Sequence, residues 1–437
     1  MNGISEHMKT IQLNRKVMYA LLGLNILAFI YYFWFLINKG HLPSPFFYDT
    51  SDTFMDLFNP LVQLSRKGIY NEYHSIYPPL NFLILKCLAW ITNISRTVDA
   101  DSLRESSTSL IFIYLAIYLL TPALILRTKS FNVLKLWDKK LLYFIFIFSF
   151  PYLFLLERGN ILLFSFIPLA MALNPDSTKR ELWIAILINL KPYFIFLSLI
   201  YLFKKEWNSF FRTAWIASSI FVITGLIIDP QHFILMFGNL VKFSDQDNIF
   251  AARGIFSLPS SIDSFFYVIE NKEIRLSAYF KTAFQYFYYP FWNFLRVISL
   301  AGSLYALFVF SKRLTFSIIC LGIILLMLNL SFFSGGYILN IYLILLPFLI
   351  KMRFKSIYLA CISLMIFPWI LLPSVFNDNL DYLNYSFLSH SFVYGAEYKI
   401  LLGSFIIPLA NFVIFLTFNY EIYLAYVAPN TVQHPNN

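Results

Sequence analysis

The sequence has few charged residues. Asp, Glu, Lys and Arg make up 13% of its 437 residues, about half of the roughly 25% that is usual in soluble domains. Hydrophobic residues make up 59%, and they include 50 Phe, 29 Tyr and 8 Trp. A water-soluble core cannot hide so much apolar surface, so we expect lipid to cover much of it. Composition therefore excludes several soluble domains, a disordered chain, a coiled coil and a disulfide scaffold.

Cysteine and the common catalytic motifs are also scarce. The three cysteines, Cys87, Cys320 and Cys361, lie inside apolar stretches and have neither disulfide nor metal-ligand spacing. The sequence contains no Walker loop, no histidine-carboxylate metal motif and no Gly-x-Ser-x-Gly elbow. These chemistries are therefore not indicated.

The formal charge of +10 does not indicate nucleic-acid binding here. Most basic residues flank apolar segments, as at Arg15-Lys16, Lys204-Lys205, Lys312-Arg313 and Lys351 to Lys355. Positive charge in such places is typical of the cytoplasmic loops of membrane proteins. We therefore predict the lipid bilayer, and no nucleic acid, as a partner.

About twelve segments are long and apolar enough to be candidate membrane spans. Two of them, 160–174 and 337–350, are short enough to be incomplete. The candidates run over residues 17–38, 77–95, 108–126, 141–157, 160–174, 182–203, 213–229, 287–310, 314–333, 337–350, 356–373 and 399–419. The sequence predicts an all-α polytopic membrane protein, one domain over residues 1–437, with about 10–12 transmembrane helices.

One basic segment conflicts with this count. If Arg15-Lys16 is cytoplasmic, the other three basic clusters are cytoplasmic too, but the segment from Arg127 to Lys140, with five basic residues, falls outside. Either a segment before residue 160 is not a true span, or this loop is an exception. Both interpretations stay open at this point.

Two long external loops follow from the predicted topology, at 39–76 and 230–286. Long loops in compact proteins usually carry function. In the first loop, Asp52 and Asp56 are four residues apart. If Ser51 caps a short helix, both carboxylates share one face near its start. They are either solvated acids of an interfacial helix or a general base held at the membrane edge.

Charged and polar residues inside or between apolar segments are further candidates. Lys191 stands beside Pro192 in an apolar segment and is either an inward cation near a kink or a snorkelling lysine. Glu157 and Arg158 lie between two apolar runs and could neutralise each other. In the second loop Arg253 is the preferred cation for an anionic leaving group, because its guanidinium binds phosphate bidentately.

The order of several short motifs resembles the polytopic GT-C glycosyltransferases, in particular the bacterial mannosyltransferases that use polyprenyl-phosphate sugars and the phage-type glucosyltransferases that modify O-antigen. The resemblance covers most of residues 45 to 350. The motifs are the acidic first loop, the Gly-x-Tyr at 68–70, Tyr77-Pro78-Pro79-Leu80, Gly159-Asn160, Lys191-Pro192, and the polar gap 334–337 followed by Tyr342 and Pro347.

The resemblance implies a GT-C fold and assigns roles residue by residue. The catalytic aspartate of the first loop corresponds to Asp52, which we prefer, or to Asp56. The resemblance implies that Tyr77 and Asn160 bind substrate, and that Lys191, Arg158 and Arg253 are candidates for the donor phosphate. The late element often carries a histidine before its tyrosine; here Asn340 and Tyr342 stand in its place as substrate-binding candidates.

We therefore expect a hexosyltransferase that moves glucose or mannose from polyprenyl phosphate to a lipid-linked or cell-envelope glycan such as O-antigen. It is expected in a bacterial inner membrane, with its active site on the periplasmic face and no cofactor, although two acids leave a divalent metal open. The alternatives are an O-antigen polymerase or ligase, and a transporter of lipid-linked sugars, which would show repeated halves.

Overall fold

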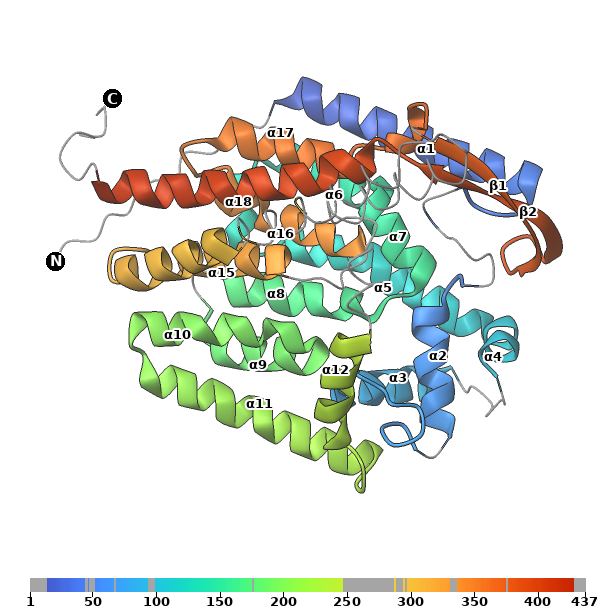
Figure 1. The fold of residues 1–437 in the computed structure, drawn as a ribbon, viewed down its shortest axis with the longest axis horizontal. Helices are drawn as coiled ribbons and strands as arrows, with labels where there is room; N and C mark the ends of the chain where they lie inside the picture. The colour runs from blue at the N-terminus through green and yellow to red at the C-terminus, as the bar shows by residue number, and fades with distance from the viewer. Residues whose placement is uncertain are drawn as a thin grey trace.

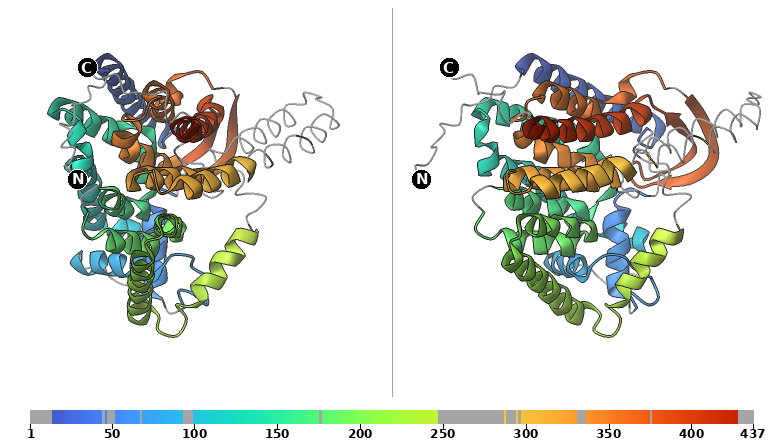
Figure 2. Two further views of the ribbon diagram at one scale, coloured as in Figure 1. Left: turned by 90° about the vertical axis from the view of Figure 1, so that its left-hand side faces the viewer. Right: turned by 60° about the vertical axis from the view of Figure 1, so that its left-hand side comes forward.

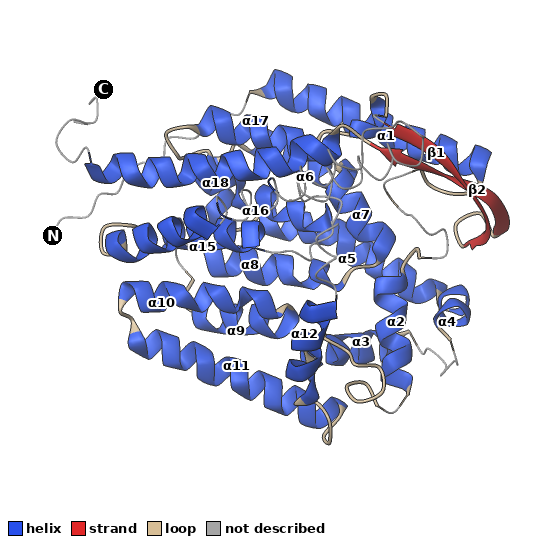
Figure 3. Ribbon diagram, in the orientation of Figure 1, coloured by secondary structure: helices blue, strands red, loops and turns tan. Residues whose placement is uncertain are grey.

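The computed structural model describes residues 14–43, 46, 52–66, 68–92, 99–174, 177–246, 287, 294, 297–330, 336–374 and 376–427. Within these residues the protein is helical apart from one two-stranded hairpin, as Figure 3 shows. The predicted helical membrane protein is confirmed at this level. The hairpin, β1 (Phe376–Ser386) with β2 (Ser391–Ile400), was not predicted.

Four described helices are long and apolar enough to cross a membrane. The pair α6 (Leu136–Phe148) and α7 (Phe150–Arg158), bent by 49° at Ser149, is a fifth candidate if it is counted as one span. The four long helices are α1 (Arg15–Lys39), α5 (Thr108–Leu126), α11 (Trp207–Ile228) and α18 (Gly403–Val427). Their apolar residues face outward in large numbers, such as Phe33, Phe112, Trp215 and Leu416, which suits contact with lipid.

The other apolar helices are shorter than the predicted spans. They are α3 (Pro79–Ile91), η2 (Ile161–Ser165) with α8 (Phe166–Leu173), α9 (Arg180–Leu190), η3 (Pro192–Ser198) with α10 (Leu199–Lys204), Val297–Phe310, α15 (Phe316–Leu330), η5 (Gly336–Leu339) with α16 (Asn340–Leu349), and α17 (Lys355–Ile366). The predicted span 356–373 ends at Ile366 in the structure, because the chain continues through η6 (Trp369–Leu371) into β1.

Smaller elements lie mainly at the two ends of the helices. They are α2 (Met55–Ser65), α4 (Ala100–Ser106), η1 (Lys129–Val133) and α12 (Leu235–Gln246). In Figure 1, α2 and α12 run across the direction of the long helices, on the side away from α10. Figure 2 shows the hairpin at this same end of the molecule. Thus α2 is an element of the end of the bundle and is not a span.

The basic segments gather at one end of the bundle. Arg15, at the start of α1, donates from Nε to Asp138 Oδ1 of α6 at 3.0 Å. The guanidinium of Arg180 lies 3.8 Å from the ring centroid of Phe316, and Lys204 donates to the Leu314 carbonyl. We call this the basic end; in Figure 1 it is the left-hand side of the view, where α10 lies.

The predicted span 182–203 is wrong as a single crossing. Arg180 and Lys204, which flank it, both contact the segment Leu314–Phe316 at the basic end. The chain therefore enters along α9, reverses at Lys191-Pro192 and returns along η3 and α10. Proline has no N–H and follows an extended lysine, and both features favour a break in the helix there.

The predicted span 77–95 is also not a crossing. α3 has 13 residues, about 20 Å at 1.5 Å per residue, against roughly 30 Å of hydrocarbon. It starts at Pro79, and the chain is back at the same end by Arg104, which bonds to Thr53. The absence of this crossing also decides on which side the segment from Arg127 to Lys140 lies. With one crossing fewer before it, the segment lies at the basic end, as the contact of Asp138 with Arg15 shows.

We predict that Asn132 and Lys205 lie on one side of the membrane and Ser106 on the other. All three are exposed positions at the ends of helices. Each would be replaced by cysteine in a chain lacking Cys87, Cys320 and Cys361, and labelled with a membrane-impermeant maleimide in intact cells and after lysis. Labelling of Ser106→Cys alone in intact cells is expected; labelling of Asn132→Cys and not of Ser106→Cys would restore α3 as a crossing.

Candidate functional site

The acidic turn before α2 has a strained backbone. Phe54, which stands where α2 begins, has φ 63° in the left-handed region, and no side chain caps the helix. Such a conformation in a residue other than glycine costs about 1–3 kcal/mol. The predicted cap, Ser51, lies outside the described residues. Asp56 is in the first turn of α2, where the helix dipole favours a negative charge.

A second segment holds this turn in place. Glu157 accepts from the Phe54 N–H through its carbonyl at 2.7 Å, and from Thr53 Oγ1 through its side chain at 3.2 Å. Gly159 has φ 64°, and a Cβ there would lie 2.9 Å from Leu57 Cβ. Only glycine lets the 157–160 segment approach so closely. Chain segments about 100 residues apart thus form one unit.

Arg158 joins the two candidate acids. Its guanidinium pairs with Asp52 through Nη1, and with Asp56 Oδ1 through Nη2 at 3.0 Å. Asn160 Nδ2 donates to the other oxygen of Asp56 at 2.6 Å. The sequence suggested that Glu157 and Arg158 could neutralise each other. In the structure they do not, because each binds the acidic turn.

The Asp56 carboxylate lies at the boundary between protein and solvent. About 20% of its side chain is exposed, against 33% for Asp52. Burial raises the pKa of Asp56 above its ordinary value, while the hydrogen bond from Asn160 and the charge of Lys191 act in the opposite direction. A raised pKa brings the Asp56 carboxylate closer to the working range of a base near neutral pH, which makes Asp56 a candidate general base.

Lys191 brings a cation to the same place. It lies at the reversal between α9 and η3, which is fixed by a 2.8 Å hydrogen bond from Asn81 Nδ2 to the Leu190 carbonyl. The ammonium is 4.8 Å from the ring centroid of Tyr77. Within the described chain it has no hydrogen bond or ion pair. A half-buried cation held by a ring face, and near Asp56, is suited to bind an anion.

Three tyrosines surround these charges. Tyr77 is an electrostatic neighbour of Asp56 and Tyr337, and Tyr193 is a neighbour of both tyrosines. Tyr337 stacks on Phe154 with ring centroids 5.9 Å apart. Tyr193 and Tyr337 were not among the predicted site residues. Their positions, directly after Lys191-Pro192 and after a glycine pair, are the signals that could have identified them.

Two residues that were predicted to bind substrate, Asn340 and Tyr342, make hydrogen bonds inside the protein instead. Asn340 is buried and donates to the carbonyls of Pro151 at 2.9 Å and Tyr337 at 2.8 Å. Tyr342 is buried and hydrogen-bonded to Asn411 of α18. The structure therefore does not bring these two side chains to Asp56. Arg253, the preferred phosphate ligand, lies outside the described residues, as does most of the loop 230–286.

The described residues contain no group of three or more His, Cys, Asp and Glu side chains that could hold a metal ion. Comparison with known proteins assigns no family: no family model, no curated protein and no solved structure matches the chain. The case for a function therefore depends on the geometry of the acidic turn, Lys191 and the tyrosines.

Gly159→Ala is expected to destabilise the protein by about 1–3 kcal/mol, because it places a side chain in a left-handed conformation and against Leu57. Thermal unfolding in detergent measures the change. Gly302→Ala is the matched control, since nothing lies within 4 Å of a Cβ there. Equal unfolding temperatures for both variants would contradict the tight docking of the 157–160 segment.

Proposed function

We propose that the protein is a membrane glycosyltransferase that moves a hexose, glucose or mannose, from polyprenyl phosphate to a lipid-linked or cell-envelope glycan. The observation that carries this proposal is that a partly exposed carboxylate, Asp56, lies near a cation, Lys191, whose ammonium has no hydrogen bond among the described residues. Helix α2, which carries Asp56, lies at the end of the helices opposite the basic end (Figure 1). The charge rule assigns the basic end to the cytoplasm.

The two groups suit a single displacement. Asp56 takes the proton of the acceptor hydroxyl while the acceptor oxygen forms the new bond to the sugar C1. The bond from C1 to the phosphate oxygen breaks, and the polyprenyl phosphate leaves with the electron pair. Lys191 stabilises the negative charge that grows on this phosphate. One base and one cation on opposite sides of C1 would give inversion at that carbon.

The surrounding residues support these roles. Asn160 and Arg158 fix both oxygens of Asp56, so that the carboxylate keeps one orientation. Tyr77 fixes the Lys191 ammonium by its ring face. With Tyr193 and Tyr337 it also supplies aromatic faces of the kind on which a sugar ring packs. Arg158 is thus proposed to orient the base, in addition to its sequence-based role as a phosphate candidate.

Transfer of radiolabelled hexose from polyprenyl-phosphate glucose and polyprenyl-phosphate mannose tests the proposal. We expect activity with one donor, and a loss on the order of 10²–10⁴-fold in Asp56→Asn, the range typical of a general base. Lys191→Met should lose activity too, while Glu72→Gln, an exposed acid after the first loop turn, should keep it. Transfer by none of the membranes, or full activity of Asp56→Asn, would contradict the proposal. An altered glycan length in cells without transfer would favour the polymerase alternative.

The pH dependence gives a second prediction. A base must be deprotonated, so activity is present above the pKa of Asp56 and is lost as the pH falls through it. Since burial raises this pKa, the acidic limb of kcat/KM should lie above the ordinary range of aspartate.

Asn160→Ala removes a hydrogen bond that favours the carboxylate, so the acidic limb should move to higher pH. Asn132→Ala, an exposed asparagine at the basic end, should leave it in place. An unchanged or lower limb in Asn160→Ala would show that Asp56 is not the group that titrates.

A further inference from the structure

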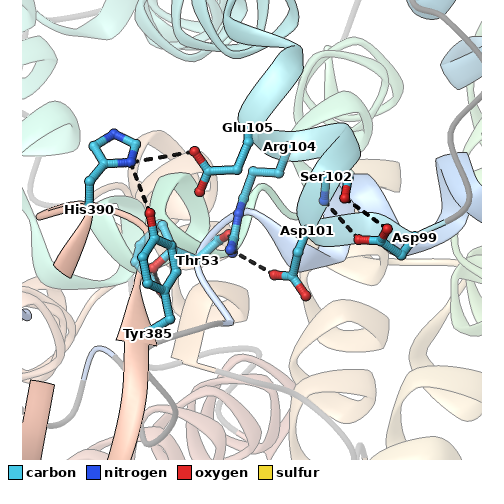
Figure 4. A network of polar contacts seen from close by, with 9 residues as sticks. Thr53, Asp99, Asp101, Ser102, Arg104, Glu105, Tyr385 and His390 are labelled. Carbon is cyan, nitrogen blue, oxygen red and sulfur yellow. Dashed lines mark hydrogen bonds and ion pairs between the residues drawn. The ribbon is translucent and has the colours of Figure 1, made fainter. Parts of the chain in front are cut away.

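Arg104 is a buried arginine at the acidic turn, and the mechanism proposed above does not use it. It lies in α4 with only 1% of its surface exposed. Its Nη1 donates to the Thr53 carbonyl at 2.8 Å, and its Nη2 pairs with Asp101 Oδ1 at 2.8 Å (Figure 4). Arginine is rarely buried unless it is paired, so a buried arginine directly beside the acidic turn indicates a specific role there.

The hairpin closes over the guanidinium. The ring centroid of Phe387, at the tip between β1 and β2, is 4.4 Å from Arg104 Cζ and 6.2 Å from the ring of Phe54. Figure 4 shows how the tip is tied to α4: His390 Nδ1 is 3.4 Å from Glu105 Oε2 and 3.3 Å from the Tyr385 hydroxyl. The ring thus shields the bond between Arg104 and Thr53 from water.

The position of Thr53 explains why this bond matters. Thr53 precedes Phe54, whose left-handed backbone turns the chain between Asp52 and Asp56. Its carbonyl is held by a charged donor in a buried place, where such bonds are stronger than neutral ones. On its other side the turn is held by Glu157. The turn is therefore clamped from two elements that are distant in the sequence.

We infer that Arg104 is a positioning residue that, under the Phe387 ring, clamps the Thr53–Phe54 turn and so holds Asp52 and Asp56 toward Arg158, Asn160 and Lys191. The inference rests on the proposed function, because it assigns Arg104 to the transfer reaction through the base. Arg104 does not touch the reacting atoms. It acts through Thr53, and the hairpin tip acts through Arg104.

Arg104→Gln tests this role in the hexose-transfer assay. Loosening the turn should lower kcat on the order of 10–100-fold, since a misplacement of about 1 Å can cost that much, and should change KM little. The acidic limb should also move to higher pH, because Asp56 would lose contact with Asn160. Arg104→Lys keeps a positive donor and should restore part of the rate. Arg66→Gln, an exposed arginine at the end of α2, is the control and should change nothing.

Phe387→Ala keeps the experiment decisive if Arg104→Gln does not fold. Opening the guanidinium to water should lower kcat in the same direction, with a smaller shift of the acidic limb, while Phe387→Leu should stay near the starting rate. Unchanged kcat and pH profile in Arg104→Gln, or in Phe387→Ala if the first variant is not folded, would overturn the inference. If the inference on Arg104 fails in this way, loss of activity in Asp56→Asn would still support the proposed function. Full activity of Asp56→Asn would overturn the proposed function itself.

Discussion

The candidate site depends on one close contact, the docking of the 157–160 segment against the turn before α2. Gly159 permits it, because a side chain at that position would collide with Leu57. The contact satisfies the Phe54 N–H and Thr53 hydroxyl through Glu157, and it brings Arg158 and Asn160 to Asp56. The strain at Phe54 persists because these bonds oppose its release. Without this docking, the two acids would be solvated charges at the membrane edge.

Two chain reversals complete the site. α3 starts just after Tyr77 and does not cross, and the α9–η3 pair turns back at Lys191. They come from opposite ends of the bundle, and Asn81 of α3 bonds to the Leu190 carbonyl at the tip of the second. The lysine thus reaches the tyrosine ring at the depth of Asp56. Irregular backbone at membrane depth is tolerated where protein buries it, which is the situation here.

Composition predicted the helical membrane protein, and the charge pattern predicted that the basic clusters share one side. The spacing of Asp52 and Asp56 pointed to the turn that Arg158 joins. Hydropathy could not detect the reversal at Lys191, because an apolar run has the same composition whether it crosses or returns. For the same reason α3 was counted as a span, and the side of Arg127 to Lys140 stayed open until the contact of Asp138 with Arg15 placed it at the basic end. The sequence analysis did not single out Arg104, since its burial depends on Phe387 far along the chain. Tyr342 was predicted to bind substrate because of the family resemblance. The sequence gives no sign that its hydroxyl bonds to Asn411.

The central claim is that Asp56 and Lys191 face the two ends of the bond that breaks. The most direct test is an experimental structure of the protein with a polyprenyl-phosphate hexose bound to the inactive Asp56→Asn variant. We predict that the phosphate lies within hydrogen-bond distance of the Lys191 ammonium, with the sugar against Tyr77 and its C1 toward residue 56. A donor molecule bound at the basic end, or bound at the opposite end without contact to Lys191, would contradict the account.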